Sequence, residues 1–210
     1  AADVADGLVT LVASVADHEG NRCADVSVTF TVDTVPPEIV VSSPADGLLT
    51  NQPLVSLAGA LSEPASLTID GAPLAVADDL TFTGQLPLQE GANAVAFRAE
   101  DRAGHVTDVL VTVLLDTVPP AAIDAARVEV GMPVEGTVAV TGGAGAAEAG
   151  AAVRLTNPRT GEIVDAIAAA DGAFTATITA AGGDQLFLVA IDPAGNVGPT
   201  IGVTVLSDPT

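Results

Sequence analysis

The stretch "VSVTFTVDTVPP" (26–37) decides the fold, because it joins a strand pattern to a stiff connector, and its last five residues return unchanged at 116–120. Valine and phenylalanine alternate with serine and threonine along 26–32. This period of two is typical of a strand with one buried face. Proline fixes φ and restricts the residue before it to extended conformations. Each copy of "DTVPP" therefore predicts a short, stiff connector directly after a strand.

The repeated pentapeptide belongs to a longer internal repeat, which covers 6–37, 90–120 and 182–209. In each segment a strand pattern ends in aspartate, a glycine follows three residues later, and a second strand pattern ends in another aspartate. A type I turn followed by a left-handed residue favours this arrangement, so each segment is predicted to be a β-hairpin. The residues are Asp17, Gly20 and Asp33 in the first segment, Asp101, Gly104 and Asp116 in the second, and Asp192, Gly195 and Asp208 in the third.

Further strand patterns precede the second and third hairpins. They cover 38–43, 54–62, 65–71, 72–79 and 80–86 in one case, and 126–130, 136–145, 151–157, 162–170 and 172–180 in the other. About seven strands in roughly 80–90 residues, separated by glycine, proline, asparagine and aspartate, are typical of an immunoglobulin-like sandwich. The predicted fold class is all-β, with tandem immunoglobulin-like antiparallel β-sandwiches joined by short Pro-Pro linkers.

Three segments are predicted along the chain. Residues 36–116 and 117–210 each form one immunoglobulin-like repeat, whereas 1–35 form only the C-terminal hairpin of an incomplete repeat. Two strands alone are marginally stable in water. We therefore expect this hairpin either to belong to an excerpt that begins within a domain or to be completed by another molecule through self-association.

Composition narrows the classes of partner. Lysine is absent, the six basic residues are arginines against 27 acidic residues, and the formal net charge is −21. Such a charge repels nucleic acid and anionic lipid surfaces, so neither is an expected partner. No apolar run approaches the roughly 18 residues of a transmembrane helix, so no membrane insertion is expected. The single cysteine, Cys23, is expected to be a small buried side chain in a strand rather than a reactive thiol.

The sequence carries no catalytic signature. It has no Gly-x-Ser-x-Gly elbow, no His-Glu-x-x-His and no phosphate-binding loop that ends in lysine. Tryptophan and tyrosine are absent, and the five phenylalanines lie in strand patterns, where they are expected in the core rather than on a sugar-stacking face. His18 and His105 fall in or next to hairpin turns and are expected to be exposed. The chain is therefore predicted not to be an enzyme.

Four stretches carry a resemblance to a known family: "VDTVPPEI" (32–39), "AEAGAAVRL" (147–155), "ADGAFTATI" (170–178) and "AIDPAGNVG" (190–198). They resemble the bacterial immunoglobulin-like repeats that occur in tandem in large secreted and surface-anchored proteins, above all adhesins. The resemblance covers 34–208 and the hairpin before it. One departure is "DRAGH" (101–105), which ends in histidine where the third hairpin has asparagine. The cysteine pair, core tryptophan and tyrosine corner of antibody domains are also missing.

The joints between repeats are the candidate sites. In a sandwich of this topology, the end of one repeat is expected to meet two loops of the next, the loop between its last two strands and the loop between its second and third strands. This gathers Asp33, Glu63 and Asp101 at the first joint, and Asp116, Glu148 and Asp192 at the second. A hard cation that takes six to eight oxygen ligands would satisfy such carboxylates. Joints of this kind bind calcium in the resembled adhesins, which makes calcium the candidate cofactor. The alternative is that these acids only hold turns and cap the linkers.

These features predict a non-catalytic stalk or scaffold, a rigid rod of immunoglobulin-like domains in a secreted or cell-surface bacterial adhesin or extracellular filament. Its expected partners are the neighbouring repeats of the same chain, and no motif identifies an adhesion ligand. Two alternatives stay open. One is an accessory region of a large secreted polysaccharide-acting enzyme, and the other is a self-polymerising filament subunit completed by its N-terminal hairpin.

Overall fold

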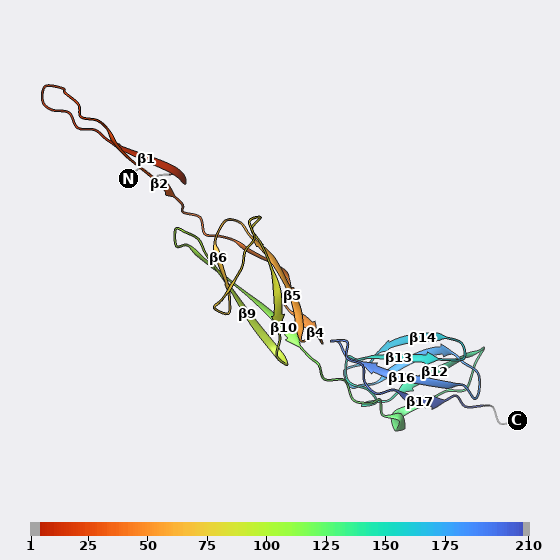
Figure 1. Ribbon diagram of the computed structural model, residues 1–210. Helices are drawn as coiled ribbons and strands as arrows, with labels where there is room; N and C mark the ends of the chain where they lie inside the picture. The colour runs from red at the N-terminus through yellow and green to blue at the C-terminus, as the bar shows by residue number, and fades with distance from the viewer. Residues whose placement is uncertain (1–4, 208–210) are drawn as a thin grey trace. The chain divides into compact units, whose positions relative to one another are not determined.

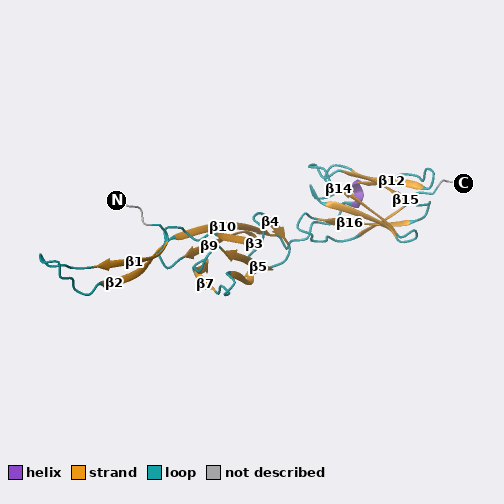
Figure 2. Ribbon diagram, turned by 90° about the horizontal axis from the view of Figure 1, so that it is seen from above, coloured by secondary structure: helices purple, strands orange, loops and turns teal. Residues whose placement is uncertain are grey.

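The computed structural model describes residues 5–207, and within them the chain consists of strands and one short 3₁₀ helix, η1 (Ala125–Arg127) (Figures 1 and 2). The strands form a two-stranded hairpin and two immunoglobulin-like sandwiches, so the predicted all-β fold class is confirmed. Asp208, predicted to end the third hairpin, lies outside the described residues. In the described part of the chain, no helix has the length and apolar character needed to cross a membrane.

The first sandwich consists of a three-stranded and a five-stranded sheet. The three-stranded sheet has the order β3 (Ile39–Ser43), β5 (Leu54–Leu61) and β8 (Thr81–Pro87). The five-stranded sheet has the order β4 (Leu48–Thr50), β10 (Val106–Leu115), β9 (Gly91–Glu100), β6 (Ser66–Ile69) and β7 (Ala72–Leu74). Phe82 and Phe97 come from different sheets, are both buried, and pack with 6.2 Å between their ring centroids. This aromatic pair forms part of the core.

Strand β4 departs from the purely antiparallel sandwich that the sequence predicts. It pairs parallel to β10, with Leu48 opposite Val113 and Thr50 opposite Leu115. A strand of three residues is too short to show a period of two. The chain enters β4 through Gly47, whose positive φ of 76° favours glycine. The sequence therefore marks the turn before this strand better than the strand itself.

The second sandwich consists of a three-stranded and a four-stranded sheet. The first sheet has the order β11 (Val128–Val130), β12 (Thr137–Gly142) and β15 (Phe174–Thr179). The second has the order β14 (Glu162–Ile167), β13 (Ala152–Asn157), β16 (Gln185–Ile191) and β17 (Ile201–Thr204). Along β15, Phe174, Ala176 and Ile178 are buried while the threonines between them are exposed. Successive side chains of a strand point to opposite faces, so this alternation places one face in the core.

The N-terminal hairpin consists of β1 (Gly7–Ala13) and β2 (Val26–Val32), which pair antiparallel and are drawn as a two-stranded ribbon in Figure 1. Val9 lies opposite Phe30, and Leu11 lies opposite Val28. Nearly all its side chains are exposed. Among the described residues, no third strand pairs with either of its strands.

Two expectations about single residues are wrong. Cys23 is exposed and lies between β1 and β2 rather than buried within a strand. Phe30 and Phe187 are exposed as well, although the other three phenylalanines are buried. Phe187 alternates with the buried Leu186 and Leu188 along β16, so its side chain lies on the outer face of the sheet. A strand pattern alone does not say which of its two faces holds the aromatic residue.

Candidate functional site at the repeat joints

All three hairpins turn through the same five-residue loop, "DHEGN" (17–21), "DRAGH" (101–105) and "DPAGN" (192–196). The backbone N–H of the first residue donates to the carbonyl of the fifth, at 2.9, 3.1 and 3.1 Å respectively. The backbone N–H of the fifth residue donates to the carboxylate of the first. A side-chain nitrogen of the fifth residue also lies within 2.9 Å of that carboxylate in every loop. The predicted role of the aspartates in holding these turns is confirmed.

Both copies of "DTVPP" leave their strand in the same way. Asp33 accepts a hydrogen bond from the Val35 N–H at 3.2 Å, and Asp116 accepts one from the Val118 N–H at 3.0 Å. The last proline of each copy is buried. Each aspartate therefore caps the connector that follows it, with one carboxylate oxygen engaged in the turn.

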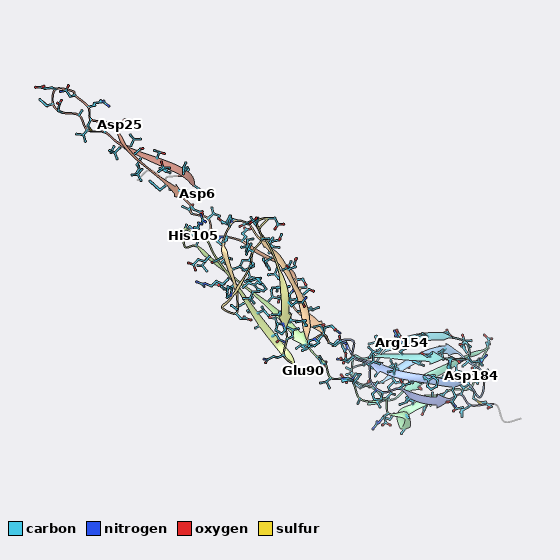
Figure 3. The ribbon with its side chains drawn as sticks, in the orientation of Figure 1. Asp6, Asp25, Glu90, His105, Arg154 and Asp184 are labelled. Atoms are coloured by element: carbon cyan, nitrogen blue, oxygen red, sulfur yellow. The ribbon has the colours of Figure 1, made fainter. Side chains whose placement is uncertain are left out.

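At the first joint, the region around 33–37, the structure gathers Asp33, Asp101 and His105. Their ligand atoms all lie within 4.8 Å of one another, and this is the only such group of three or more ionisable ligands in residues 5–207. Asp33 and Asp101 line a pocket of about 350 Å³ together with Glu63 and Arg102. Figure 3 labels His105 on the turn between β9 and β10. The three carboxylates predicted for this joint thus share one pocket.

The electrostatics of this pocket favour added positive charge. Burial raises the pKa of Glu63, and the charges of Asp33 and Asp101 raise it further. Burial acts in the same direction on Asp101, but hydrogen bonds from the backbone and ring of His105 and from the Gly104 N–H outweigh it, so the pKa of Asp101 is lowered. The negative charges of Asp33 and Asp101 thus repel that of Glu63. A cation between them would relieve this repulsion.

At the second joint, the region around 116–120, an amide group lies between the predicted ligands. Asn196 Nδ2 donates to the Asp192 carboxylate at 2.8 Å and to the main-chain carbonyl of Asp116 at 2.7 Å. Burial raises the pKa of Asp192, but hydrogen bonds from the side chain and backbone of Asn196, then from the Gly195 and Ala194 N–H groups, outweigh it and lower the pKa. The Asn196 amide thereby connects the residue after β10 to the turn after β16.

Neither predicted triad forms a complete group of close ligand atoms, because Glu63 lies outside the group of Asp33, Asp101 and His105 at the first joint. Glu148 is exposed, and Asp116, Glu148 and Asp192 do not form a group of close ligand atoms within the described residues. A metal at this triad stays a prediction. The fifth residue of the turn is asparagine here and histidine at the first joint.

His105 is the site residue that the motif analysis leaves out. Sequence reasoning treats it as an exposed turn residue, but its side chain is half-buried and its Nδ1 lies 2.9 Å from Asp101 Oδ2. The signal that finds it is positional. The fifth residue of the other two loops is asparagine, whose side chain bonds the leading aspartate, so a histidine there is expected to point into the same joint.

We expect Asn196→Ala to lower the free energy of unfolding of the second sandwich by about 1–3 kcal/mol, because it removes a donor from a buried carboxylate. Urea unfolding of the full chain measures this. Asn196→His is the matched control, since it copies the loop of the first joint and keeps a ring nitrogen near Asp192. The histidine variant is expected to lose less of this free energy of unfolding than the alanine variant. Equal losses in both variants would show that the side-chain hydrogen bond to Asp192 contributes nothing.

Comparison with known proteins finds a similar family model for each sandwich. Residues 131–207 match the family model described as the bacterial Ig domain, and residues 37–117 match the model described as glucodextranase, domain B. The expected resemblance to bacterial immunoglobulin-like repeats is therefore confirmed.

One curated relative is bacillopeptidase F of Bacillus subtilis (strain 168), which is 29% identical over 99 residues, 46% of this chain. That stretch covers only 7% of the length of bacillopeptidase F. Among solved structures, the fibronectin(III)-like modules of Clostridium thermocellum CbhA match with a TM-score of 0.54 and 13% identity, over 81% of this chain and 94% of that chain. This likeness shows the fold. Another solved structure is a Ca²⁺-stabilised adhesin that helps an Antarctic bacterium bind ice. It matches with a TM-score of 0.40 and 19% identity, over 96% of this chain and 57% of that chain.

Proposed function

We propose that the chain is a non-catalytic structural scaffold in a secreted or cell-surface bacterial protein, where its immunoglobulin-like repeats space other parts of that protein. The observation that carries this proposal is the bonded joint, in which Asn196 ties the Asp116 carbonyl to the turn of the following sandwich. A joint with its own buried hydrogen bonds resists bending more than a flexible linker does. The match to the bacterial Ig domain supports the same role.

Within that role, a stalk of an adhesin or extracellular filament is the first candidate. An accessory region of a secreted polysaccharide-acting enzyme is the second, and the match of 37–117 to glucodextranase domain B favours it. In both cases the repeats themselves are not catalytic. The purified chain is expected to hydrolyse neither dextran nor casein, and a hydrolytic activity that stays with these residues would overturn the scaffold role.

We further propose that calcium binds at the first joint and stiffens it. The Asp33, Glu63 and Asp101 carboxylates supply oxygen ligands of the kind that calcium prefers, and they share one pocket. The raised pKa of Glu63 reflects burial first and then the neighbouring negative charges, which a bound cation would neutralise. His105 adds a nitrogen that suits zinc better than calcium, so zinc is the competing ion.

We expect calcium to bind the full chain with a dissociation constant on the order of 10⁻⁴ to 10⁻³ M, as in extracellular modules. An ion that binds only the folded state raises the melting temperature by mass action. The expected rise is about 4 °C or more, relative to chelator. Calorimetry measures the melting temperature, and small-angle scattering with calcium or chelator reports whether the joint stiffens.

Asp33→Asn is expected to abolish this response, whereas Asp108→Asn removes the same charge from an exposed surface ion pair and is expected to keep it. Asp116→Asn tests the second triad in the same experiment. A response that survives Asp33→Asn and disappears with Asp116→Asn would place the ion at the second joint instead. If calcium changes neither the melting temperature nor the scattering of the unmodified chain, both joints are stabilised by hydrogen bonds and prolines alone.

A further inference from the structure

The N-terminal hairpin presents an apolar face to solvent. Leu11, Val28 and Phe30 have exposed fractions of 61%, 60% and 41%. They lie on one face, because Leu11 pairs with Val28 and Phe30 is two residues further along β2. A two-stranded ribbon with such a face is marginally stable in water. The face therefore requires a covering layer that the described residues do not provide.

The same hairpin occurs in the first sandwich, where it is covered. Counted back from the "DTVPP" aspartates, Val28 and Phe30 correspond to Val111 and Val113, which are 4% and 0% exposed. Counted back from the turn aspartates, Leu11 corresponds to Val95, which is 3% exposed. Apolar residues thus occupy equivalent positions that are buried in one copy and exposed in the other.

Hydrogen bonds confirm that the two hairpins are the same module. The Thr34 hydroxyl donates to Asp6 at 2.8 Å across the open end of β1 and β2, and the Thr117 hydroxyl donates to Glu90 at 2.7 Å across the open end of β9 and β10. Figure 3 labels Asp6 and Glu90 at these ends. Together with the shared turn, this means that β1 and β2 keep the geometry of a sandwich hairpin.

We propose that the β1–β2 hairpin is a docking surface for the remaining strands of an immunoglobulin-like repeat, a strand set of the same kind as residues 37–89. That set covers β9–β10 in the first sandwich, and its counterpart covers β16–β17 in the second. The expected partner is therefore a set of immunoglobulin-like strands, and each of the two sandwiches of this chain contains an example of such a set. The inference rests on the hairpin alone and does not depend on the scaffold role.

The two edges of the hairpin receive different strands. In the first sandwich β6 pairs antiparallel with β9, with Ile69 opposite Phe97 and Leu67 opposite Ala99. The equivalent positions before the first turn are 13 and 15, so a strand with apolar residues at alternate positions docks there. A second, parallel strand docks along 30–32, as β4 does along the end of β10. Both edges carry unpaired backbone groups that such strands satisfy.

A second copy of this chain is the competing occupant, because two hairpins can bury their apolar faces against each other. Such a dimer supplies the hairpin with neither an antiparallel strand of the β6 kind nor a parallel strand of the β4 kind, since the sandwiches of the second copy already use theirs. A strand set of the 37–89 kind is favoured because it covers the apolar face and pairs with both edges, whereas β17 of the second sandwich is an edge strand.

The test places a second copy of residues 37–89 directly before Asp6 in the full chain, in place of residues 1–5. This copies the junction before Glu90, and linking the strands to the hairpin raises their effective concentration. Amide hydrogen exchange along 8–13 and 26–32 is expected to slow by roughly 100-fold or more, as for strands that open only at a cost of a few kcal/mol. A second version carries residues 121–181, the strands of the second sandwich, at the same place. It tests whether a failure of the first version reflects a mismatch between the side chains of 37–89 and those of the hairpin.

Matched variants show whether the apolar face is responsible. Val28→Asp is expected to abolish the added protection, and Thr29→Asp, on the opposite face of the same strand, is expected to keep it. Fast exchange in both extended versions would overturn the proposal. Slow exchange of these amides in the unextended chain, accompanied by a dimer in sedimentation equilibrium, would also overturn it and assign the surface to a second copy.

Discussion

Gly59→Ala is expected to destabilise the first sandwich by about 3 kcal/mol or more, the upper range for overpacking a core. An added Cβ at Gly59 would lie 2.2 Å from Phe82 Cζ and 2.3 Å from the main-chain oxygen of Val40. Neither neighbour has room to move, because Val40 lies in the paired strand β3 and the Phe82 ring packs against Phe97 in the core. Thermal unfolding of the full chain should show a fall of more than about 10 °C in the transition of this sandwich.

Gly84→Ala is the matched control on the neighbouring strand β8. Its added Cβ would lie 3.5 Å from the nearest side-chain atom, which belongs to Leu57 and is at ordinary contact distance. The melting temperature of this variant is expected to stay within a few degrees of the unmodified chain. If Gly59→Ala is equally mild, β5 and β8 do not approach as closely as described.

Asp184→Ala is expected to cause the largest loss in the second sandwich among substitutions of charged residues. The buried Asp184 carboxylate accepts hydrogen bonds from Arg159 Nε at 2.5 Å, from Asn157 Nδ2 at 3.0 Å and from the Ala181 N–H at 2.9 Å. Removing it leaves Asn157, which is fully buried, without one of its acceptors. Urea unfolding should show a lower midpoint with an unchanged slope.

The same carboxylate makes stability depend on pH. Hydrogen bonds from Arg159, then Ala181 and Asn157, hold the pKa of Asp184 well below its ordinary value. A depressed pKa in the folded state adds stability above the unfolded-state pKa of about 4, and this stability is lost as the pH falls below that value. The midpoint should therefore fall between about pH 4 and pH 2, and Asp184→Asn should flatten this fall.

Asp165→Ala is the matched control for the Asp184 variant. Asp165 pairs with Arg154 through two hydrogen bonds of 2.8 Å, but both side chains are more than two-fifths exposed. Exposed ion pairs contribute little to stability, so this variant should unfold close to the unmodified chain. Equal losses for Asp165→Ala and Asp184→Ala would contradict the importance assigned to burial.

The two joints show how one position of a turn changes what a joint can do. With asparagine as the fifth residue, an amide N–H lies between the Asp192 carboxylate and the Asp116 carbonyl. With histidine, the ring lies beside Asp101 and the Asp33 carboxylate comes within reach of both. One joint is closed by hydrogen bonds, and the other concentrates negative charge. The calcium experiment with Asp33→Asn and Asp116→Asn tests whether the two joints differ in their response to cations.

The sequence by itself determined the strands, the hairpins and the turns. The period of two in 26–32 and 109–116 gives each strand one apolar face, and the Asp-x-x-Gly loops hold their turns through bonds between residues four apart or fewer. These are local interactions, so each can be read from a short window. The resemblance to bacterial immunoglobulin-like repeats rests on short windows of the same kind, and it is confirmed over 131–207.

Only the tertiary structure decided which further residues join the predicted acids and which apolar faces are covered. His105 and Asp101 lie in one turn and meet Asp33 from a distant part of the chain, and Glu148 stays exposed although it occupies the expected loop. The three-residue strand β4 is likewise fixed by its partner β10 rather than by its own pattern. Strand patterns state that a face is apolar, but burial depends on a second layer brought by distant residues. That is why the β1–β2 hairpin has the pattern of a core element and remains exposed.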